Sequence, residues 1–154
     1  MNSKRSRILL KVISLLCLLG LLTSFYLIYT HYTAQGNCGI IAGEGCSIAD
    51  SSIYSKIFGI PVAFFGALWF AFSFALILQT LRGNREIVGT LLIWEIIGLI
   101  AIGYFVRAEY KLNTICSLCT IVHVLILLSF ILTVLMYALS KDKPPLKPHL
   151  NLKR

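Results

Sequence analysis

The sequence predicts an all-α integral membrane protein, a four-helix transmembrane bundle with a short surface helix in the first non-cytoplasmic loop. Of its 154 residues, 58% are hydrophobic and 13% are charged, and the mean hydropathy is +0.85. These values lie far above those of a typical globular domain. The apolar residues also form four unbroken runs of about 20 residues, the length of a helix that crosses a bilayer. We therefore exclude a soluble globular domain.

The four runs predict membrane spans at about residues 8–29, 61–81, 87–106 and 115–139. The first run follows three basic residues, as in a signal peptide, but it exceeds the usual apolar region of about 7–15 residues and no small-x-small cleavage site follows. We interpret it as a retained span. Only residues 82–86 separate the second and third spans, which predicts an antiparallel helical hairpin. We expect one transmembrane domain over 1–140 and a disordered basic cytoplasmic tail over 141–154.

The net charge of +8 follows the expected membrane orientation. A nucleic-acid-binding role would need a basic face on folded structure, and the distribution of charge offers none. Eleven of the 14 basic residues lie at the N-terminus, between the second and third spans, or in the tail. This positive-inside bias predicts that both termini are cytoplasmic in the cell inner (plasma) membrane. The other three are Lys56, Arg107 and Lys111.

The loop between the first two spans, residues 30–60, is too long to be a simple connector. Its first half, residues 33–45, is rich in glycine and small residues, and we expect it to be mobile. Residues 47–58 carry apolar side chains at helical spacing, which predicts a helix along the membrane surface, capped by Ser47 or Asp50. Gly59 is expected to end this helix, and Pro61 suits the first turn of the second span.

The five cysteines fall into two pairs and a single residue. Cys38 and Cys46 lie in the long loop, and Cys116 and Cys119 begin the fourth span. The predicted orientation puts both pairs on the non-cytoplasmic side, where disulfides form and persist. Cys17 lies among leucines in the first span, and we interpret it as a small buried hydrophobe.

The Cys116-x-x-Cys119 motif is expected at a helix N-terminus, where both sulfurs lie on one face. Unpaired N–H groups and the helix dipole would stabilise a thiolate there and lower the cysteine pKa. We expect Cys116 to be the outer residue, accessible to another thiol, and Cys119 to face the bundle. This pattern favours redox chemistry. A structural disulfide and two unrelated buried thiols are the alternatives.

The loop pair, Cys38 and Cys46, flanks a segment with three glycines. Thiol–disulfide exchange requires direct contact between sulfurs. A flexible segment would let one cysteine reach a partner protein and the other reach Cys116, so the pair is expected to act as a shuttle. A loop-stapling disulfide is the alternative. A zinc site of four thiolates is disfavoured because the loop pair is spaced more widely than in typical zinc ribbons.

Several residues within the spans are candidates for contact with a quinone or for proton transfer. His123 follows Cys119 by one helical turn and can bind a quinone carbonyl, relay a proton or simply bond a neighbouring helix. Glu95 lies mid-span, where an ionisable residue suggests a neutral acid or a member of a proton path, or else an interhelical hydrogen bond. Four aromatic residues could form a slot for a flat ring, although lipid-facing packing explains most of them equally well: Phe64, Phe65, Trp69 and Phe70.

Together these patterns resemble the vitamin K epoxide reductase family in its prokaryotic form, over most of residues 15–135. Cys-x-x-Cys alone would be weak evidence, but the ordered set of motifs on a four-span profile is specific. The matching features are the loop pair Cys38-x7-Cys46, the serines Ser51-Ser52, Phe58-Gly59-Ile60-Pro61 before the second span, and Ile115-Cys116-Ser117-Leu118-Cys119 before the fourth.

The resemblance implies a four-helix bundle around a quinone, ubiquinone or menaquinone, with Cys119 beside the ring. It implies that Cys116 exchanges with Cys46 and that Cys38 faces a thioredoxin-fold, DsbA-like disulfide carrier. Family members are often fused to such a domain. This chain carries none, so we expect a separate carrier. The expected quinone contacts are Cys119, His123, Ser52, Phe65 and Trp69.

Two comparisons refine this resemblance. The vertebrate enzymes have a tyrosine where His123 stands, which counts against epoxide reduction and anticoagulant sensitivity. The DsbB-type oxidases carry their two cysteine pairs in the reverse order along the chain. We therefore predict a membrane thiol:quinone oxidoreductase that generates disulfides. The alternatives are a quinone or quinone-epoxide reductase and a non-catalytic membrane protein with structural disulfides or a metal site.

Overall fold

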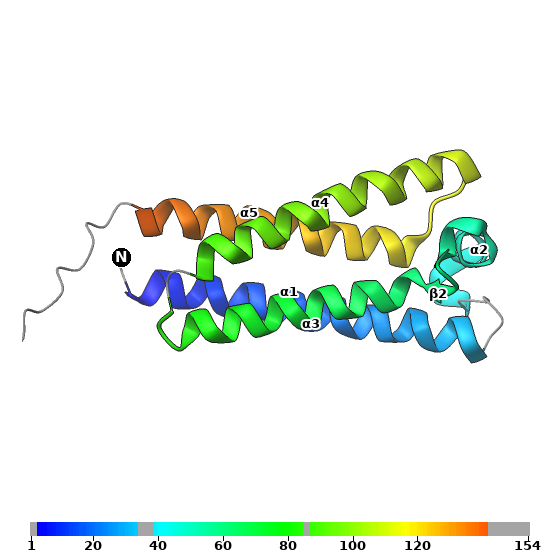
Figure 1. Cartoon of the computed structure of the whole chain (residues 1–154). Helices are drawn as coiled ribbons and strands as arrows, with labels where there is room; N and C mark the ends of the chain where they lie inside the picture. The colour runs from blue at the N-terminus through cyan, green and yellow to red at the C-terminus, as the bar shows by residue number, and fades with distance from the viewer. Residues whose placement is uncertain (1–2, 34–38, 85–86, 142–154) are drawn as a thin grey trace, which may run out of the picture.

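Four long helices form an elongated bundle in the computed structural model, which describes residues 3–33, 39–84 and 87–141 (Figure 1). They are α1 (Ser3–Thr33), α3 (Val62–Leu81), α4 (Ile87–Leu112) and α5 (Ser117–Lys141). Each contains a segment long and apolar enough to cross a membrane. The predicted all-α transmembrane bundle is confirmed, and the chain fits a multi-pass membrane protein.

The helices extend beyond the spans predicted from hydropathy. α1 begins five residues earlier than the predicted span, at Ser3, and continues to Thr33, while α4 continues to Leu112. Hydropathy marks the part of a helix that suits hydrocarbon, whereas backbone hydrogen bonds continue through polar residues at either end. The last turn of α4 therefore extends past the predicted end at residue 106 and reaches the region of the cysteines.

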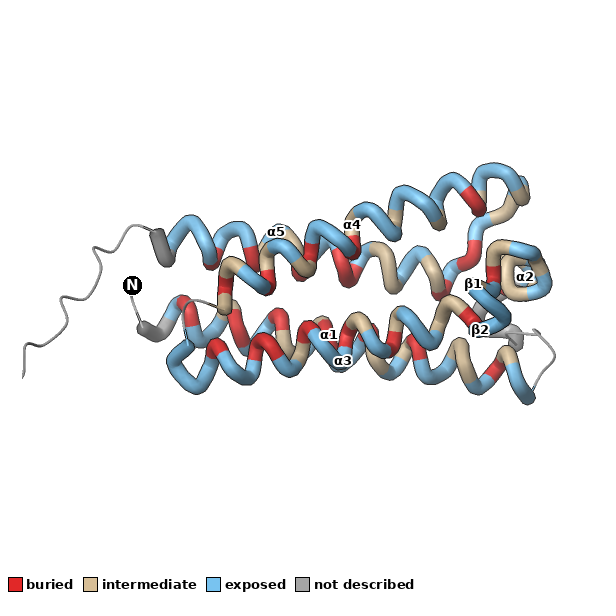
Figure 2. Tube along the Cα trace, in the orientation of Figure 1, coloured by how far each residue is buried: buried red, intermediate tan, exposed pale blue. Residues whose placement is uncertain are grey.

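The inner faces of the helices form the main core, and the outer faces are apolar and exposed (Figure 2). α1 packs along α3 and α5, and α4 packs against α5 and α3. Outward side chains such as Leu22 and Ile100 are 65% and 70% exposed, as expected for helices long and apolar enough to cross a membrane. Cys17 is buried, as predicted. The core consists of Leu10, Ile13, Cys17, Phe70, Leu76, Ile77, Val88, Leu91, Leu125, Ile126 and Met136.

One acidic side chain, Glu95, lies fully buried between α4 and α5. The Oγ atom of Ser129 lies 2.7 Å from Glu95 Oε2 and 3.1 Å from the carbonyl oxygen of Ile126. A serine hydroxyl has only one proton. A protonated Glu95 can donate to Ser129, which then donates to Ile126, so both short contacts become hydrogen bonds. The geometry therefore fits a neutral carboxylic acid that links two helices.

The loop after α1 differs from its prediction. Residues 39–51 form the helix α2 (Gly39–Ser51), so residues 39–45 of the segment expected to be mobile are helical, and their mobility stays a prediction. Residues 34–38, which include Cys38, lie outside the described residues. The helix predicted over 47–58 is also wrong in its bounds, because α2 ends at Ser51. The oxygen of Ser52 then accepts a hydrogen bond from the backbone N–H of Tyr54 and caps the short 3₁₀ helix η1 (Ile53–Ser55).

A small β-hairpin follows and leads into the second span. Strand β1 (Lys56–Ile57) pairs antiparallel with β2 (Ile60–Pro61). Phe58 and Gly59, the two turn residues, have φ angles of 53° and 82°. Two positive φ angles are typical of the tight turns that join hairpin strands and are incompatible with an α-helix. Gly59 therefore belongs to a turn and does not end a helix, and Pro61 immediately precedes α3.

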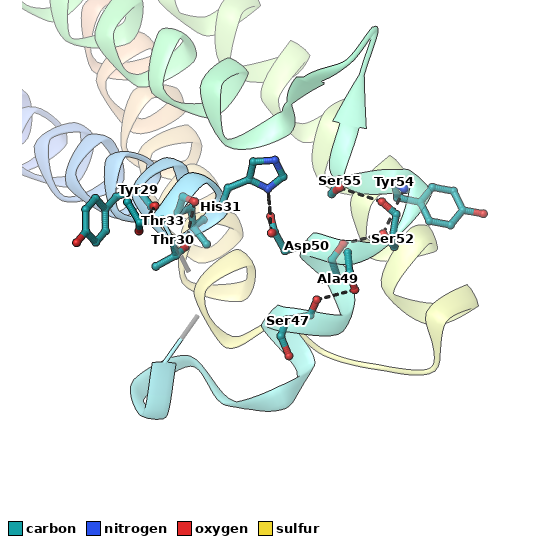
Figure 3. A network of polar contacts seen from close by, with 12 residues as sticks. Tyr29, Thr30, His31, Thr33, Ser47, Ala49, Asp50, Ser52, Tyr54 and Ser55 are labelled. Atoms are coloured by element: carbon teal, nitrogen blue, oxygen red, sulfur yellow. Dashed lines mark hydrogen bonds and ion pairs between the residues drawn. The ribbon is translucent and has the colours of Figure 1, made fainter. Parts of the chain in front are cut away.

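Two close contacts hold α2 across one end of the bundle. His31, near the end of α1, contacts Asp50 of α2 with its Nδ1 atom 2.8 Å and 2.9 Å from the two carboxylate oxygens (Figure 3). On the other side, the Gly45 backbone packs so tightly against Ile115 and Thr114 that a Cβ atom would collide with them. α2 is thus fixed over the point where α5 begins.

Candidate active site

Three cysteine side chains form a continuous row beneath α2. Cys46 of α2 is in hydrogen-bond contact with Cys116, and Cys116 is in hydrogen-bond contact with Cys119. Cys46 and Cys116 are each only 1% exposed. With Leu118 they form a second apolar cluster, separate from the main core. All three sulfurs are free thiols. Because neighbouring sulfurs are already in contact, thiol–disulfide exchange along the row needs little movement.

The start of α5 fixes two of these sulfurs. Cys116 immediately precedes the helix, and its Sγ accepts a hydrogen bond from the backbone N–H of Cys119 at 3.3 Å. A side chain that accepts this bond acts as an N-cap, because it satisfies one of the N–H groups left unpaired in the first helical turn. Cys119 lies within that turn and is half-buried. The motif therefore begins the helix, as predicted.

The electrostatics of these thiols differ from the prediction. Burial, together with the hydrogen bond to Cys116, raises the pKa of Cys46 to about 11. The pKa of Cys116 is also raised, first by its hydrogen bond to Cys119 and then by burial. The expected lowering of the cysteine pKa by the helix N-terminus is thus outweighed for Cys116. Cys116 is also not an exposed outer residue, because Cys46 and α2 cover it.

An apolar cavity of about 240 Å³ opens beside the row of sulfurs, and Cys46, Cys116 and Cys119 all line it. All four long helices, α2 and η1 contribute to its wall. The volume is slightly below the roughly 300–1,000 Å³ of typical small-molecule sites and offers room for one substituted ring. Of the predicted contact residues, Ser52, Phe65, Trp69 and His123 also line this cavity.

The aromatic residues of α3 separate into two groups. Phe65 and Trp69 line the cavity, whereas Phe64 does not and is 45% exposed, and Phe70 is buried in the main core. The expected slot of four aromatic rings is therefore reduced to two. The indole Nε1 of Trp69 is buried and finds no hydrogen-bond partner among the described residues. An unpaired buried donor at a cavity wall is a candidate ligand contact.

The other two predicted contacts are fixed by their neighbours. His123 stacks on Phe105, with ring centroids 6.4 Å apart and an angle of 17° between the planes. Ser52 donates a hydrogen bond to the carbonyl oxygen of Ala49 at 2.7 Å while it accepts one from Tyr54. The ring of His123 and the hydroxyl of Ser52 are thus held in defined positions at the cavity.

The sequence reasoning missed one acidic residue at this site. Glu109, in the last turn of α4, lines the cavity, and its Oε1 accepts a hydrogen bond from the backbone N–H of Cys116 at 3.3 Å. The available signal was an acid seven residues before the Cys-x-x-Cys motif. The span predicted from hydropathy ends at residue 106, so Glu109 is not among the predicted site residues.

The geometry agrees with the comparison of the sequence with known proteins. The model of the vitamin K epoxide reductase family matches residues 11–134. The chain belongs to this family. No curated protein and no solved structure matches it significantly. Members of the vitamin K epoxide reductase family are oxidoreductases that act on quinone or vitamin K substrates, so a membrane redox activity based on cysteines is the expected activity.

Proposed function

We propose that this protein is a membrane thiol:quinone oxidoreductase that generates disulfides. Electrons pass from a reduced thioredoxin-fold carrier to Cys38–Cys46, then to Cys116–Cys119, and finally to a quinone in the cavity. One observation carries the proposal. The thiols of Cys46, Cys116 and Cys119 form a continuous row, and this row borders an apolar cavity of suitable size.

The proposed exchange proceeds in balanced steps. The carrier dithiol reduces the Cys38–Cys46 disulfide and leaves oxidised. The Cys46 thiolate then attacks Cys116 of the Cys116–Cys119 disulfide and releases Cys119. Cys38 next attacks Cys46 of the mixed disulfide, which frees Cys116 and restores Cys38–Cys46. The dithiol Cys116–Cys119 then gives two electrons and two protons to the quinone and returns to the disulfide.

The residues around the cavity fit a quinone. Its walls are predominantly apolar, and the unpaired Trp69 Nε1–H can donate to a carbonyl oxygen. Phe65 and Trp69 offer aromatic surfaces, while Ser52 and His123 offer polar atoms. The quinone, when bound, supplies a two-electron, two-proton acceptor. Ubiquinone and menaquinone both satisfy this chemistry.

The orientation is part of the proposal. α1 begins and α5 ends at the end of the bundle opposite to α2 (Figure 1). With the basic residues concentrated at that end, the positive-inside rule makes it cytoplasmic. The cysteines then face the non-cytoplasmic side of the inner membrane, where a separate carrier can be oxidised and disulfides persist.

A coupled assay tests the function. Purified protein receives a reduced thioredoxin-fold carrier and a quinone, and the quinone absorbance is followed. We expect turnover that is lost in Cys116→Ala and Cys119→Ala, because each removes a sulfur of the terminal dithiol. Cys17→Ala is the matched control, since Cys17 lies in the core away from the cavity. An inert wild-type protein would favour a non-catalytic role.

The family match also supports a second candidate, reduction of a quinone or quinone epoxide as the main role. The same cysteines would serve it, with a dithiol as the electron source. Replacing the quinone by its epoxide in the assay separates the two functions. Turnover of the quinone without turnover of the epoxide favours disulfide generation.

A further inference from the structure

The carboxylate of Glu109 occupies a special position at the cysteine site. It projects from the last turn of α4, lines the cavity together with Cys116 and Cys119, and accepts a hydrogen bond from the N–H of Cys116. Its backbone is held in turn, since the carbonyl oxygen of Glu109 accepts a hydrogen bond from the N–H of Thr114 at 3.2 Å. Both its backbone and its side chain are thus fixed against the segment that carries the dithiol.

Oxidation of the dithiol presents a charge problem at this location. Two thiols become a disulfide only if two protons leave, and the attacking species is a thiolate. Cys116 is almost fully buried and Cys119 is half-buried. Creating an additional negative charge in such surroundings is costly. If a neighbouring carboxylate accepts the thiol proton, the number of charges at the site does not change, and the N-terminus of α5 continues to stabilise one negative charge.

Building on the proposed function, we propose that Glu109 is the proton acceptor for the Cys116–Cys119 dithiol. The first step converts a thiol and the Glu109 carboxylate into a thiolate and a carboxylic acid. Glu109 passes this proton through the cavity to the quinone and becomes a carboxylate again. The thiolate and the second thiol then form the disulfide, their two electrons pass to the quinone, and Glu109 accepts the second thiol proton. Glu109 passes this proton on as well, so that two protons and two electrons reach the quinone and the carboxylate is restored.

The other titratable groups at the cavity are less suited to this task. The carboxylate of Asp50, from α2, is engaged on both oxygens by His31 of α1. His123 of α5 lies one turn below Cys119, with its ring against Phe105. Tyr54 of η1 also lines the cavity, and no titratable side chain comes from the described part of α3. Arg107 and Lys111 of α4 are exposed. Of the two acids that line the cavity in the described residues, Asp50 is hydrogen-bonded to His31, whereas Glu109 is hydrogen-bonded to the dithiol segment.

The test compares Glu109→Gln with Glu44→Gln in the full-length protein. The glutamine oxygen still accepts the hydrogen bond from the N–H of Cys116, but the amide cannot take a proton. The variant therefore keeps the position of the side chain and loses only the proton transfer. Glu44 is an exposed acid of α2 and serves as the matched control. We expect Glu109→Gln to slow quinone reduction by about 100-fold or more, within the range for a lost general base, and Glu44→Gln to retain the wild-type rate.

A second readout requires no quinone. The fully reduced proteins are alkylated for short times over a pH series, and labelling of Cys116 and Cys119 is quantified by peptide mapping. In Glu109→Gln, labelling should be slow near neutral pH and rise about tenfold per pH unit, because only solvent accepts the proton. The labelling rate of the wild type should depend less steeply on pH. Glu109→Asp should show a pH dependence between those of Glu109→Gln and the wild type.

The outcomes separate the two proposals. Wild-type turnover and an unchanged pH profile in Glu109→Gln would overturn the role of Glu109. A wild type that reduces no quinone would overturn the proposed function, while the alkylation profiles would still test Glu109. Thermal unfolding of each variant shows whether the fold is kept. If Glu109→Gln does not fold, the Glu109→Asp variant decides whether Glu109 transfers protons. Failure of Glu109→Asp to restore part of the wild-type pH dependence counts against proton transfer.

Discussion

Gly45→Ala should slow electron transfer between the two cysteine pairs although it alters no sulfur. Gly45 precedes Cys46 in α2, and its backbone lies against the segment just before α5. A Cβ atom there would lie 3.0 Å from the carbonyl carbon of Ile115 and from Thr114 Oγ1, and closer still to the Ile115 carbonyl oxygen. Glycine at this position therefore permits close approach of two backbones.

The expected magnitude follows from these distances. Ordinary contacts of a Cβ atom begin at 3.4 Å, so α2 must retreat by at least about 0.4 Å, and further to clear the carbonyl oxygen. Cys46 moves with it, away from Cys116. Misplacement of reacting groups by about 1 Å can cost about 100-fold in rate, and we expect a 10- to 100-fold slowing. The free energy of unfolding should change only modestly. Overpacking costs about 1–3 kcal/mol, and the higher helix propensity of alanine offsets up to about 1 kcal/mol of this loss.

The assay isolates one disulfide. In a Cys38→Ala, Cys119→Ala background, diamide oxidation should form a Cys46–Cys116 cross-link, and peptide mapping without reductant gives its rate. Gly89→Ala is the matched control, because it adds a Cβ atom to another helix where nothing lies within 4 Å. An unchanged cross-linking rate in Gly45→Ala, in a protein of normal stability, would refute the close-approach argument.

Three further predictions follow from the site and the core. Cys119→Ala alone should accumulate a Cys46–Cys116 mixed disulfide during turnover, since Cys116 then lacks its partner, and its absence in non-reducing peptide maps would contradict the proposed order of exchange. The pKa of Cys46 is raised from 9.0 to about 11, so its contribution to stability is complete below pH 9 and is lost as the pH rises towards 11. The melting temperature should fall over this range and fall less in Cys46→Ser. Glu95→Gln should unfold within about 1 kcal/mol of the wild type, because Ser129 meets a neutral hydrogen-bonding group in both. A much larger loss would show that Glu95 is ionised.

The transmembrane fold could be predicted because lipid imposes a simple rule on the sequence. An apolar run of sufficient length must be helical, and runs separated by five residues must turn back on each other. The Cys-x-x-Cys motif could likewise be assigned to a helix start. The structure places Cys46, Cys116 and Cys119 on one cavity wall, whereas Cys38 lies outside the described residues.

The outer loop was harder to predict because tertiary contacts determine it. The hydrogen bond between His31 and Asp50 joins residues 19 positions apart, and no local sequence pattern predicts it. The helix α2 ends where Ser52 caps the next turn, and the positive φ angles of Phe58 and Gly59 follow from the hairpin. The expected shift of the Cys116 pKa is reversed first by its hydrogen bond to Cys119 and then by burial, because α2 lies over it.

The sulfur of Cys116 has two roles, because it caps α5 and also exchanges covalent partners. Its hydrogen bond with the N–H of Cys119 belongs to the thiol state, so the stability of the helix start and the reduction potential of the dithiol are thermodynamically linked. If the cap contributes about 1 kcal/mol and is lost on oxidation, it makes the potential of the pair less negative by about 20 mV. Any substitution that alters the first turn of α5 would then alter the potential as well, even at a position that never contacts a sulfur.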